Sequence, residues 1–442
     1  MATVTERYDA LLRWVEEEGG SLNPAIEIYH DDVTKGSYRV KDSCSVGVDD
    51  VIVSLPLSKT LSYLDAISCH PDFSPSSSSN NSSLEEQSHF PAEFLEKTPP
   101  HVVGRFFLMQ EYLLGSESKW WPYIQTLPQP EHMSTALPAM WPSDDIGFLK
   151  GTNAFVAVQD IKSTLKKEYK DAMKLLPERY HAEYTRLLYY WAYSIFTSRS
   201  FRPSLILPAE ALSGLPCELD DFSVLLPLYD IGNHSPLAQI AWTTDEQARV
   251  CTLKTRQRYS AGEQVFNNYG MKTNAELLLG YGFVLSEDDR LHNDYVHIKT
   301  KADPDAGDLA ATHVVSLRPM VHPSSFVGRS KLLSAESMSC LPCFSHIQDT
   351  LIAALYESIT KGEDETSDVS LNEIMRGDIS EQVLEKIINS LGAKMSIDLE
   401  DIEENEPEYE AANRNQHLAT CYRDQCRKVL ENALRSLMAG NG

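Results

Sequence analysis

The stretch from residue 262 to residue 284, which reads GEQVFNNYGMKTNAELLLGYGFV, constrains the fold of this chain more than any other. A charged turn leads into a short strand and the polar step NNYG at 267–270, and a helix-like segment then ends in YGF at 281–283. Glycine allows a positive φ or a close backbone approach, so two Tyr-Gly pairs predict phenol groups at a crowded site. Upstream, residues 228–235 read LYDIGNHS, a polar Asn-His-Ser turn that closes an apolar run.

Length and charge limit the class of protein. A chain of 442 residues has room for two or three domains, and 39 basic against 64 acidic residues give a net charge of −25. Such a field repels nucleic acid phosphates and anionic membranes and attracts basic proteins, although acidity can also serve solubility alone. With no apolar run of about 18 residues and no signal or transit segment at the start, we expect a cytoplasmic or nuclear monomer without a membrane span.

The eight cysteines are scattered, and without a secretory signal they are expected to be reduced thiols. The pair Cys340 and Cys343 has the spacing of half a zinc site, but no second pair lies near it in the sequence. Because a structural zinc site needs four convergent ligands, we expect no metal.

The pattern along the chain alternates between strands and helices. Residues 1–23 predict a helix that ends at two glycines, and residues 24–62 predict short strands. A Ser/Asn-rich loop is expected at 68–90, a helical insertion at about 91–197 that includes an apolar stripe from 180 to 195, and strands again from 222 to 284. The rest, 285–442, is predicted to be all helical, with an acidic tract at 398–410 that is either a solvated loop or a docking surface for a basic partner.

These motifs resemble the C-terminal half of a SET domain, the fold of many protein methyltransferases that use S-adenosylmethionine. The order of strands, helical insertion, motif-bearing strands and helical tail is similar to the Rubisco large-subunit methyltransferase branch, which includes ribosomal-protein lysine methyltransferases. Residues 118–124 (SKWWPYI) and 198–201 (SRSF) support the resemblance. It implies an α+β protein: a SET domain at 24–284 with a pseudo-knot, and a helical substrate-binding domain at 285–442.

The resemblance also assigns roles to individual residues. Tyr269 is expected to be the catalytic tyrosine, with its hydroxyl beside the amine and the transferring methyl group. The residues expected to bind the cofactor are Gly36, Tyr38, Arg199, Asn233, His234, Tyr269 and Tyr281. The residues expected to contact the substrate are Ser198 and Asp230, through carbonyls of an oxygen cage, and Phe283 in the wall of the channel.

One segment departs from the family pattern. The N-terminal cofactor loop of the family usually reads Gly-X-Gly, whereas residues 35–39 read KGSYR here, so a serine and an arginine stand at the glycine positions. Main-chain contacts from Gly36 and Tyr38 do not depend on side-chain identity. We therefore expect either that the side chain of Arg39 points away from the cofactor or that the loop shifts.

Three functions remain open at this point. The leading interpretation is a protein-lysine N-methyltransferase acting on a basic, non-histone protein such as a ribosomal or translation protein. The second is a protein-histidine methyltransferase of the same branch, which differs by a few side chains in the pocket. The third is a catalytically silent SET-fold protein that binds a basic partner, which the altered glycine loop favours and the presence of Tyr269 disfavours.

Overall fold

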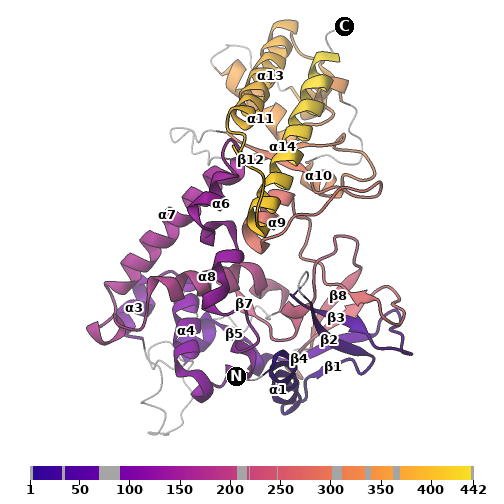
Figure 1. Cartoon of the computed structure of the whole chain (residues 1–442). Coiled ribbons are helices and arrows are strands. Elements are labelled where there is room, and N and C mark those ends of the chain that lie inside the picture. The colour runs from indigo at the N-terminus through magenta and orange to yellow at the C-terminus, as the bar shows by residue number, and fades with distance from the viewer. Residues whose placement is uncertain are drawn as a thin grey trace. The chain divides into compact units, whose positions relative to one another are not determined.

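The computed structural model describes residues 3–31, 35–68, 90–206, 217–218, 220–245, 247–300, 311–333, 340–361 and 369–439. The chain divides into two compact units (Figure 1). The first unit comprises Met1–Met133 and Ser163–Gly270, and the second comprises Ser134–Lys162 and Met271–Gly442. Almost all of the Ser/Asn-rich segment predicted at 68–90 lies outside the described residues. The domain boundaries drawn from the sequence stay a prediction.

The described residues of the first unit form three small antiparallel sheets. Their strand orders are β1-β4-β9-β8, β10-β3-β2 and β5-β7-β6. The strands are β1 Ser21–Leu22, β2 Ile26–Asp31, β3 Lys35–Val40, β4 Val51–Pro56, β5 Leu61–Ser62, β6 Ser200–Phe201, β7 Val224–Leu225, β8 Ile240–Asp245, β9 Val250–Thr255 and β10 Gln264–Val265. The strands predicted between residues 24 and 62 are confirmed.

Two of these sheets bring distant motifs together. In one, Val265 of β10 lies opposite Tyr38 of β3, so the glycine-loop segment is the neighbour of the strand that precedes the NNYG step. In the other, β7 pairs with both β5 and β6, so the strand before the LYDIGNHS motif lies beside Ser200, where the preceding helix ends. Pairing between residues so far apart in sequence places the predicted site residues of this unit near one another.

The N-terminal helix α1, Val4–Glu16, forms as expected from its sequence. Thr3 and Glu6 make a reciprocal capping box at its start, which satisfies backbone N–H groups that a helix leaves without partners. One face is buried through Leu11, Trp14 and Val15. This helix therefore packs as part of the folded unit.

The helices of the first unit are α1, α2 Tyr63–Ser68, α3 Ala92–Lys97, α4 Pro100–Leu114, α5 Trp121–Ile124, part of α7 Asn153–Met173, and α8 Arg186–Arg199. The single apolar stripe predicted from 180 to 195 is wrong at its start. Tyr180 lies in a short 3₁₀ turn, and α8 begins after Thr185, whose hydroxyl caps the amide of Leu188. Leu187, assigned to that stripe, is 60% exposed.

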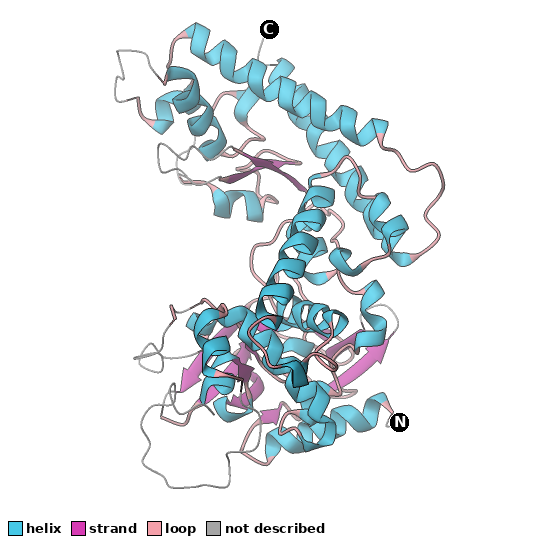
Figure 2. Cartoon of the chain, turned by 90° about the vertical axis from the view of Figure 1, so that its left-hand side faces the viewer, coloured by secondary structure: helices cyan, strands magenta, loops and turns pink. Residues whose placement is uncertain are grey.

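The second unit is mainly helical (Figure 2). Its helices are α6 Ser143–Gly147, the first part of α7, α9 Asn274–Tyr281, α10 Phe326–Lys331, α11 Asp349–Thr360, α12 Leu371–Arg376, α13 Glu381–Glu404 and α14 Arg414–Ala439. The apolar face of α14 is buried at Tyr422, Cys426 and Leu430. The helical character of the C-terminal region is thus confirmed.

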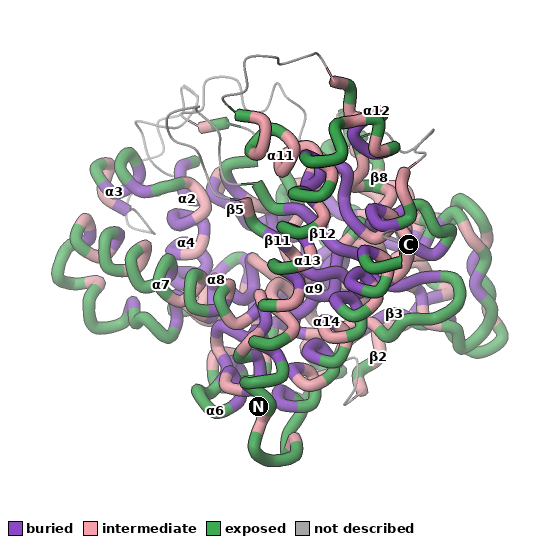
Figure 3. Tube along the Cα trace, turned by 90° about the horizontal axis from the view of Figure 1, so that it is seen from above, coloured by how far each residue is buried: buried purple, intermediate pink, exposed green. Residues whose placement is uncertain are grey.

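The sequence did not predict the strands of this unit. Strand β11, Tyr295–Lys299, pairs with β12, Thr312–Ser316, and both strands are largely buried (Figure 3). Val315 and Leu317 belong to the same apolar core as α13 and α14. The C-terminal region is therefore helical around a hairpin, not all helical. None of the described helices of the chain is long and apolar enough to span a membrane.

The acidic tract predicted at 398–410 is divided between two environments. Residues up to Glu404 form the last turns of α13, and the remainder is the loop before α14. Glu406 bonds Arg427 at 2.6 Å and the buried Arg423 at 3.3 Å, so it links this loop to α14. Glu403, Glu404, Glu408 and Glu410 are exposed.

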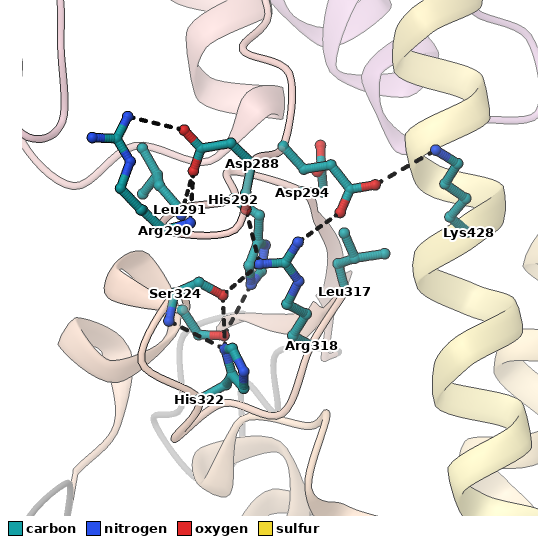
Figure 4. Close-up of polar contacts among 12 residues, drawn as sticks. Asp288, Arg290, Leu291, His292, Asp294, Leu317, Arg318, His322, Ser324 and Lys428 are labelled. Carbon is teal, nitrogen blue, oxygen red and sulfur yellow. Dashed lines mark hydrogen bonds and ion pairs between the residues drawn. The ribbon is translucent and has the colours of Figure 1, made fainter.

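A polar loop precedes β11 (Figure 4). Arg318 donates to the carbonyl of Asp288 at 3.0 Å and to the hydroxyl of Ser324 at 2.7 Å, which ties this loop to the segment after β12. Behind these contacts, His292 is fully buried and Asp294 is 2% exposed. Burial lowers the pKa of His292 to about 4 and raises the pKa of Asp294 to about 6, because it disfavours the charged form of both.

These two shifts make opposite contributions to stability on acidification. Between pH 6.5 and about 4, unfolded chains protonate His292 while the folded chain does not, so its contribution falls as pH falls. Below about pH 6 the folded chain protonates Asp294, whereas unfolded chains do so only near pH 3.8. The contribution of Asp294 to stability therefore rises as pH falls. In Asp294→Asn we expect the free energy of unfolding to fall from pH 6.5 to 4.5 by about 1–2 kcal/mol more than in the wild type.

Urea unfolding at the two pH values measures this difference. Asp289→Asn, at an exposed position of the same loop, is the control and should follow the wild type. Equal pH dependence in Asp294→Asn and the wild type would contradict the account of the buried pair.

Candidate active site

The two motifs of the first unit cross and are joined by backbone hydrogen bonds. The amide of Asn267 donates to the carbonyl of Asn233 at 2.8 Å, and the amide of Ser235 donates to the carbonyl of Asn267 at 3.0 Å. The side-chain amide of Asn267, which is 1% exposed, donates to the carbonyl of Tyr229 at 3.3 Å. The crossing therefore depends on one buried asparagine that uses both main chain and side chain.

His234 and Tyr269 hold each other at this crossing. The Nδ1 atom of His234 accepts from the amide of Tyr269 at 3.0 Å, and the two rings stack with centroids 4.9 Å apart. The hydroxyl of Tyr269 donates to the carbonyl of Gly232 at 2.9 Å. Because a hydroxyl has one donor and two acceptor positions, this bond fixes the proton and keeps the oxygen as an acceptor.

Leu228, at the entry to the crossing, has a strained backbone. Its φ is 72° and its ψ −48°, a conformation that costs a residue with a side chain about 1–3 kcal/mol. The carbonyl of Leu228 accepts from the hydroxyl of Tyr38, which is 1% exposed. Tyr38 therefore enters the site as a buried side chain that holds the strained turn, in addition to its expected main-chain role.

Two glycines of the site, Gly36 and Gly232, leave little room for side chains. A Cβ on Gly36 would lie 2.6 Å from the hydroxyl oxygen of Tyr8, and one on Gly232 would lie 3.2 Å from the ring of Tyr38. Both close approaches bring aromatic groups against main chain. The side chain of Arg39 is 49% exposed and pairs with Glu27 at 2.5 Å, so it points away from this packing as expected.

The buried carboxylate of Asp230 forms an ion pair with Arg199, which is partly exposed. Nη1 of Arg199 donates to the carboxylate Oδ2 of Asp230 at 3.1 Å and to its carbonyl at 3.2 Å. The hydroxyl of Tyr123 donates to the same Oδ2 at 3.0 Å. Burial raises the pKa of the Asp230 carboxyl, and the guanidinium of Arg199 opposes the rise. The structure thus places Arg199 against a carboxylate of the protein itself.

Ser198 lies in the last turn of α8. The final carbonyls of a helix have no amide partners within it and carry the negative end of the helix dipole. The hydroxyl of Ser198 donates back to the carbonyl of Ser194 at 2.7 Å. Main-chain carbonyls at a helix C-terminus suit an ammonium or amine.

Two predicted site residues, Tyr281 and Phe283, belong to the second unit. Their rings are 6.3 Å apart. Gly282 between them has a φ of 75° and ends α9, and Gly270 after the other tyrosine has a φ of 92°, so the positive φ expected of both Tyr-Gly pairs is confirmed. The roles expected of Tyr281 and Phe283 stay predictions.

Sequence reasoning missed Tyr8 and Tyr123 as members of the site. Tyr123 lies in the SKWWPYI segment, which supported the family resemblance and indicated no partner for this tyrosine. Its contact with Asp230 spans 107 residues, so only the tertiary fold shows it. Among the residues that the structure describes, no group of three or more His, Cys, Asp or Glu side chains is arranged to hold a metal ion.

Sequence comparison finds SET-domain enzymes. No family model matches the chain. The chain is 31% identical over 301 residues to the ribosomal lysine N-methyltransferase set10 of Schizosaccharomyces pombe, over 67% of this chain and 49% of that protein. It is 24% identical to the protein-lysine N-methyltransferase EFM1 of Saccharomyces cerevisiae over 64% of this chain and 50% of that protein. The chain therefore spans about half the length of these curated relatives.

Structure comparison gives the fold. A structure of the SET domain of LSMT bound to methyllysine and AdoHcy has a TM-score of 0.67 at 17% identity, over 98% of this chain and 91% of that one. Rubisco LSMT bound to AdoMet has a TM-score of 0.64, over 99% and 92%. The SET fold is shown, and the resemblance to the Rubisco large-subunit methyltransferase branch is confirmed.

The contact between Gly36 and Tyr8 generates a prediction. Gly36→Ala should lower the free energy of unfolding by about 1–3 kcal/mol, because the new methyl group overlaps the Tyr8 hydroxyl. In the double variant Gly36→Ala/Tyr8→Phe the overlapping oxygen is gone and most of the loss should be recovered. Urea unfolding of the two single variants and the double variant measures the coupling. Additive losses would show that Tyr8 is not what excludes a side chain at Gly36.

Proposed function

We propose that this chain, which has the SET fold, is an S-adenosylmethionine-dependent protein-lysine N-methyltransferase that acts on a non-histone protein. The observation that carries the proposal is the hydrogen-bonded crossing that joins Asn233, His234 and Tyr269. A single polar turn would carry little weight, but both motifs meet in one place and in the order typical of this fold. Similarity to lysine methyltransferases, one of them named as ribosomal, supports lysine as the target.

The residues of the first unit fit the methionine part of the cofactor. Arg199 uses only Nη1 in its contacts with Asp230, and no described residue accepts from its Nε or Nη2. That edge of a guanidinium matches a carboxylate through two parallel hydrogen bonds. The main chain at Gly36 and Tyr38, with Asn233 and His234, would hold the rest. When bound, S-adenosylmethionine supplies a methyl group on a positively charged sulfur.

The remaining work falls to residues of this chain. A lysine has a reference pKa of about 10.4 and must lose its proton before it acts as a nucleophile. An apolar channel disfavours the ammonium form, and the assignment of Tyr281 and Phe283 to its wall stays a prediction from the family resemblance. The Tyr269 oxygen, with its proton directed to Gly232, and carbonyls near Ser198 and Asp230 would orient the neutral amine. Such positioning also excludes water from the transfer.

The choice of substrate follows from charge. A net charge of −25 and exposed acidic side chains such as Glu408 and Glu410 favour a target lysine in a basic protein. We include a ribosomal or translation protein in this class. The absence of nucleic acid binding, the monomeric state and a cytoplasmic or nuclear location remain predictions from the sequence.

The test is methyl transfer from labelled cofactor into a lysate of cells that lack this protein, with mass spectrometry of the labelled residue. Wild-type protein should methylate a lysine of one basic protein. Tyr269→Phe should lower kcat about 10²–10³-fold, because the ring still packs on His234 while the oriented hydroxyl is lost. The affinity of the variant for S-adenosylhomocysteine, measured by calorimetry, should stay close to that of the wild type.

Other outcomes discriminate clearly. A labelled histidine would establish the histidine methyltransferase instead, a class to which the human actin-histidine N-methyltransferase belongs, 28% identical over 41% of this chain. Cofactor binding without any transfer, or a Tyr269→Phe variant with the wild-type rate, would exclude the proposed role of this tyrosine. If the chain binds no cofactor, the remaining function is that of a catalytically silent SET-fold protein that binds a basic partner.

A further inference from the structure

A buried triad of a tyrosine, a carboxylate and an arginine lies at the end of α8. Tyr123 of α5 and Arg199 of α8 both donate to Oδ2 of Asp230. The other carboxylate oxygen, Oδ1, has no hydrogen-bond partner among the described residues, and the Asp230 side chain is 1% exposed. Three elements that are far apart in sequence thus meet at one charged atom.

Stability alone is a weak reason for such an arrangement. Taking a carboxylate and a guanidinium out of water costs several kcal/mol, and well-packed apolar residues often replace buried ion pairs without loss. Asp230 also leaves one oxygen without a hydrogen bond, which adds to this cost. Directing a charged group is a role that apolar residues cannot fill.

Its geometry fixes the direction of Arg199. Nη1 is held by two oxygens of the same residue, the carbonyl at 3.2 Å and Oδ2 at 3.1 Å, and only a quarter of the side chain, 24%, is exposed. The hydroxyl of Tyr123 keeps the carboxylate turned towards Arg199, because it occupies the second acceptor position of Oδ2. Because the guanidinium is planar and Nη1 is held, its Nε and Nη2 atoms point in a single direction.

We propose that Tyr123 is a positioning residue for the cofactor site: it orients Asp230, and Asp230 in turn orients Arg199 to receive a carboxylate. This inference rests on the proposed function and extends it, because it assigns the SKWWPYI segment of the helical insertion to cofactor recognition. Tyr123 itself touches neither the cofactor nor the substrate. Its hydroxyl acts through the direction of the guanidinium.

The test compares two ligands that differ in the amino-acid part. S-adenosylhomocysteine carries the carboxylate that Arg199 would bind, and 5′-methylthioadenosine lacks that part. In calorimetric titrations of the full chain, Tyr123→Phe should lower the affinity for S-adenosylhomocysteine about tenfold, which corresponds to about 1.4 kcal/mol of binding free energy. It should leave the affinity for 5′-methylthioadenosine unchanged. In an Arg199→Met background, Tyr123→Phe should have no further effect on either ligand.

The chain offers a matched control for stability. Tyr189 donates to Glu168 at 2.8 Å, and Arg105 bonds the same carboxylate at 2.6 Å, which repeats the chemistry of the triad elsewhere in the first unit. Tyr189→Phe should lower the melting temperature without changing the affinity for S-adenosylhomocysteine. If Tyr123→Phe does not fold, Asp230→Asn replaces it, with the same ligand selectivity expected.

Each contrary result has a distinct meaning. If Tyr123→Phe lowers the affinity for both ligands equally, Tyr123 has a merely structural role. If it lowers the affinity for neither ligand, Arg199 is held without Tyr123. Either result overturns the inference while the proposed function stands. If the wild-type chain binds neither ligand, the proposed function fails and this inference falls with it.

Discussion

The backbone crossing at Asn233 and Asn267 is the interaction on which the site of the first unit depends. Two segments that are separate in sequence exchange main-chain hydrogen bonds there, at 2.8 and 3.0 Å. Buried backbone groups must be paired, so each segment fixes the position of the other. The stacking of His234 on Tyr269 and the bond from the Tyr269 hydroxyl to Gly232 are possible only with this register. A shift by one residue would turn these side chains away.

One buried carboxylate of the first unit, that of Asp230, is paired with an arginine. Asp230 keeps its carboxylate in a buried environment only because Arg199 and Tyr123 approach it. The strained turn at Leu228 lies close by in sequence, and the buried hydroxyl of Tyr38 holds its carbonyl. Strain and buried charge both reduce stability, and Leu228 and Asp230 both precede the crossing by a few residues in the sequence. Such features are typical of sites that are built to bind or react.

Much of this architecture was predictable from the sequence. Periodic apolar residues predicted α1, and the motifs at 228–235 and 262–283 predicted the SET fold. Both signals are local in the sequence, so they can be read without the tertiary structure. The wrong start of α8 came from Tyr180 and Tyr184, which continue an apolar period although the capping threonine at 185 ends it. The hairpin β11–β12 was missed because its strands are short and buried on both faces. The roles of Tyr8 and Tyr123 depend on tertiary contacts that no local pattern records.

Amide hydrogen exchange with and without S-adenosylhomocysteine tests the central claim most directly, that the crossing is the cofactor site. Protection should rise at residues 232–235 and 267–269 when the ligand binds, since these amides belong to the crossing, and should stay unchanged in the β11–β12 hairpin of the second unit. Binding of the ligand with unchanged exchange at 232–235 and 267–269 would contradict the account and place the cofactor elsewhere.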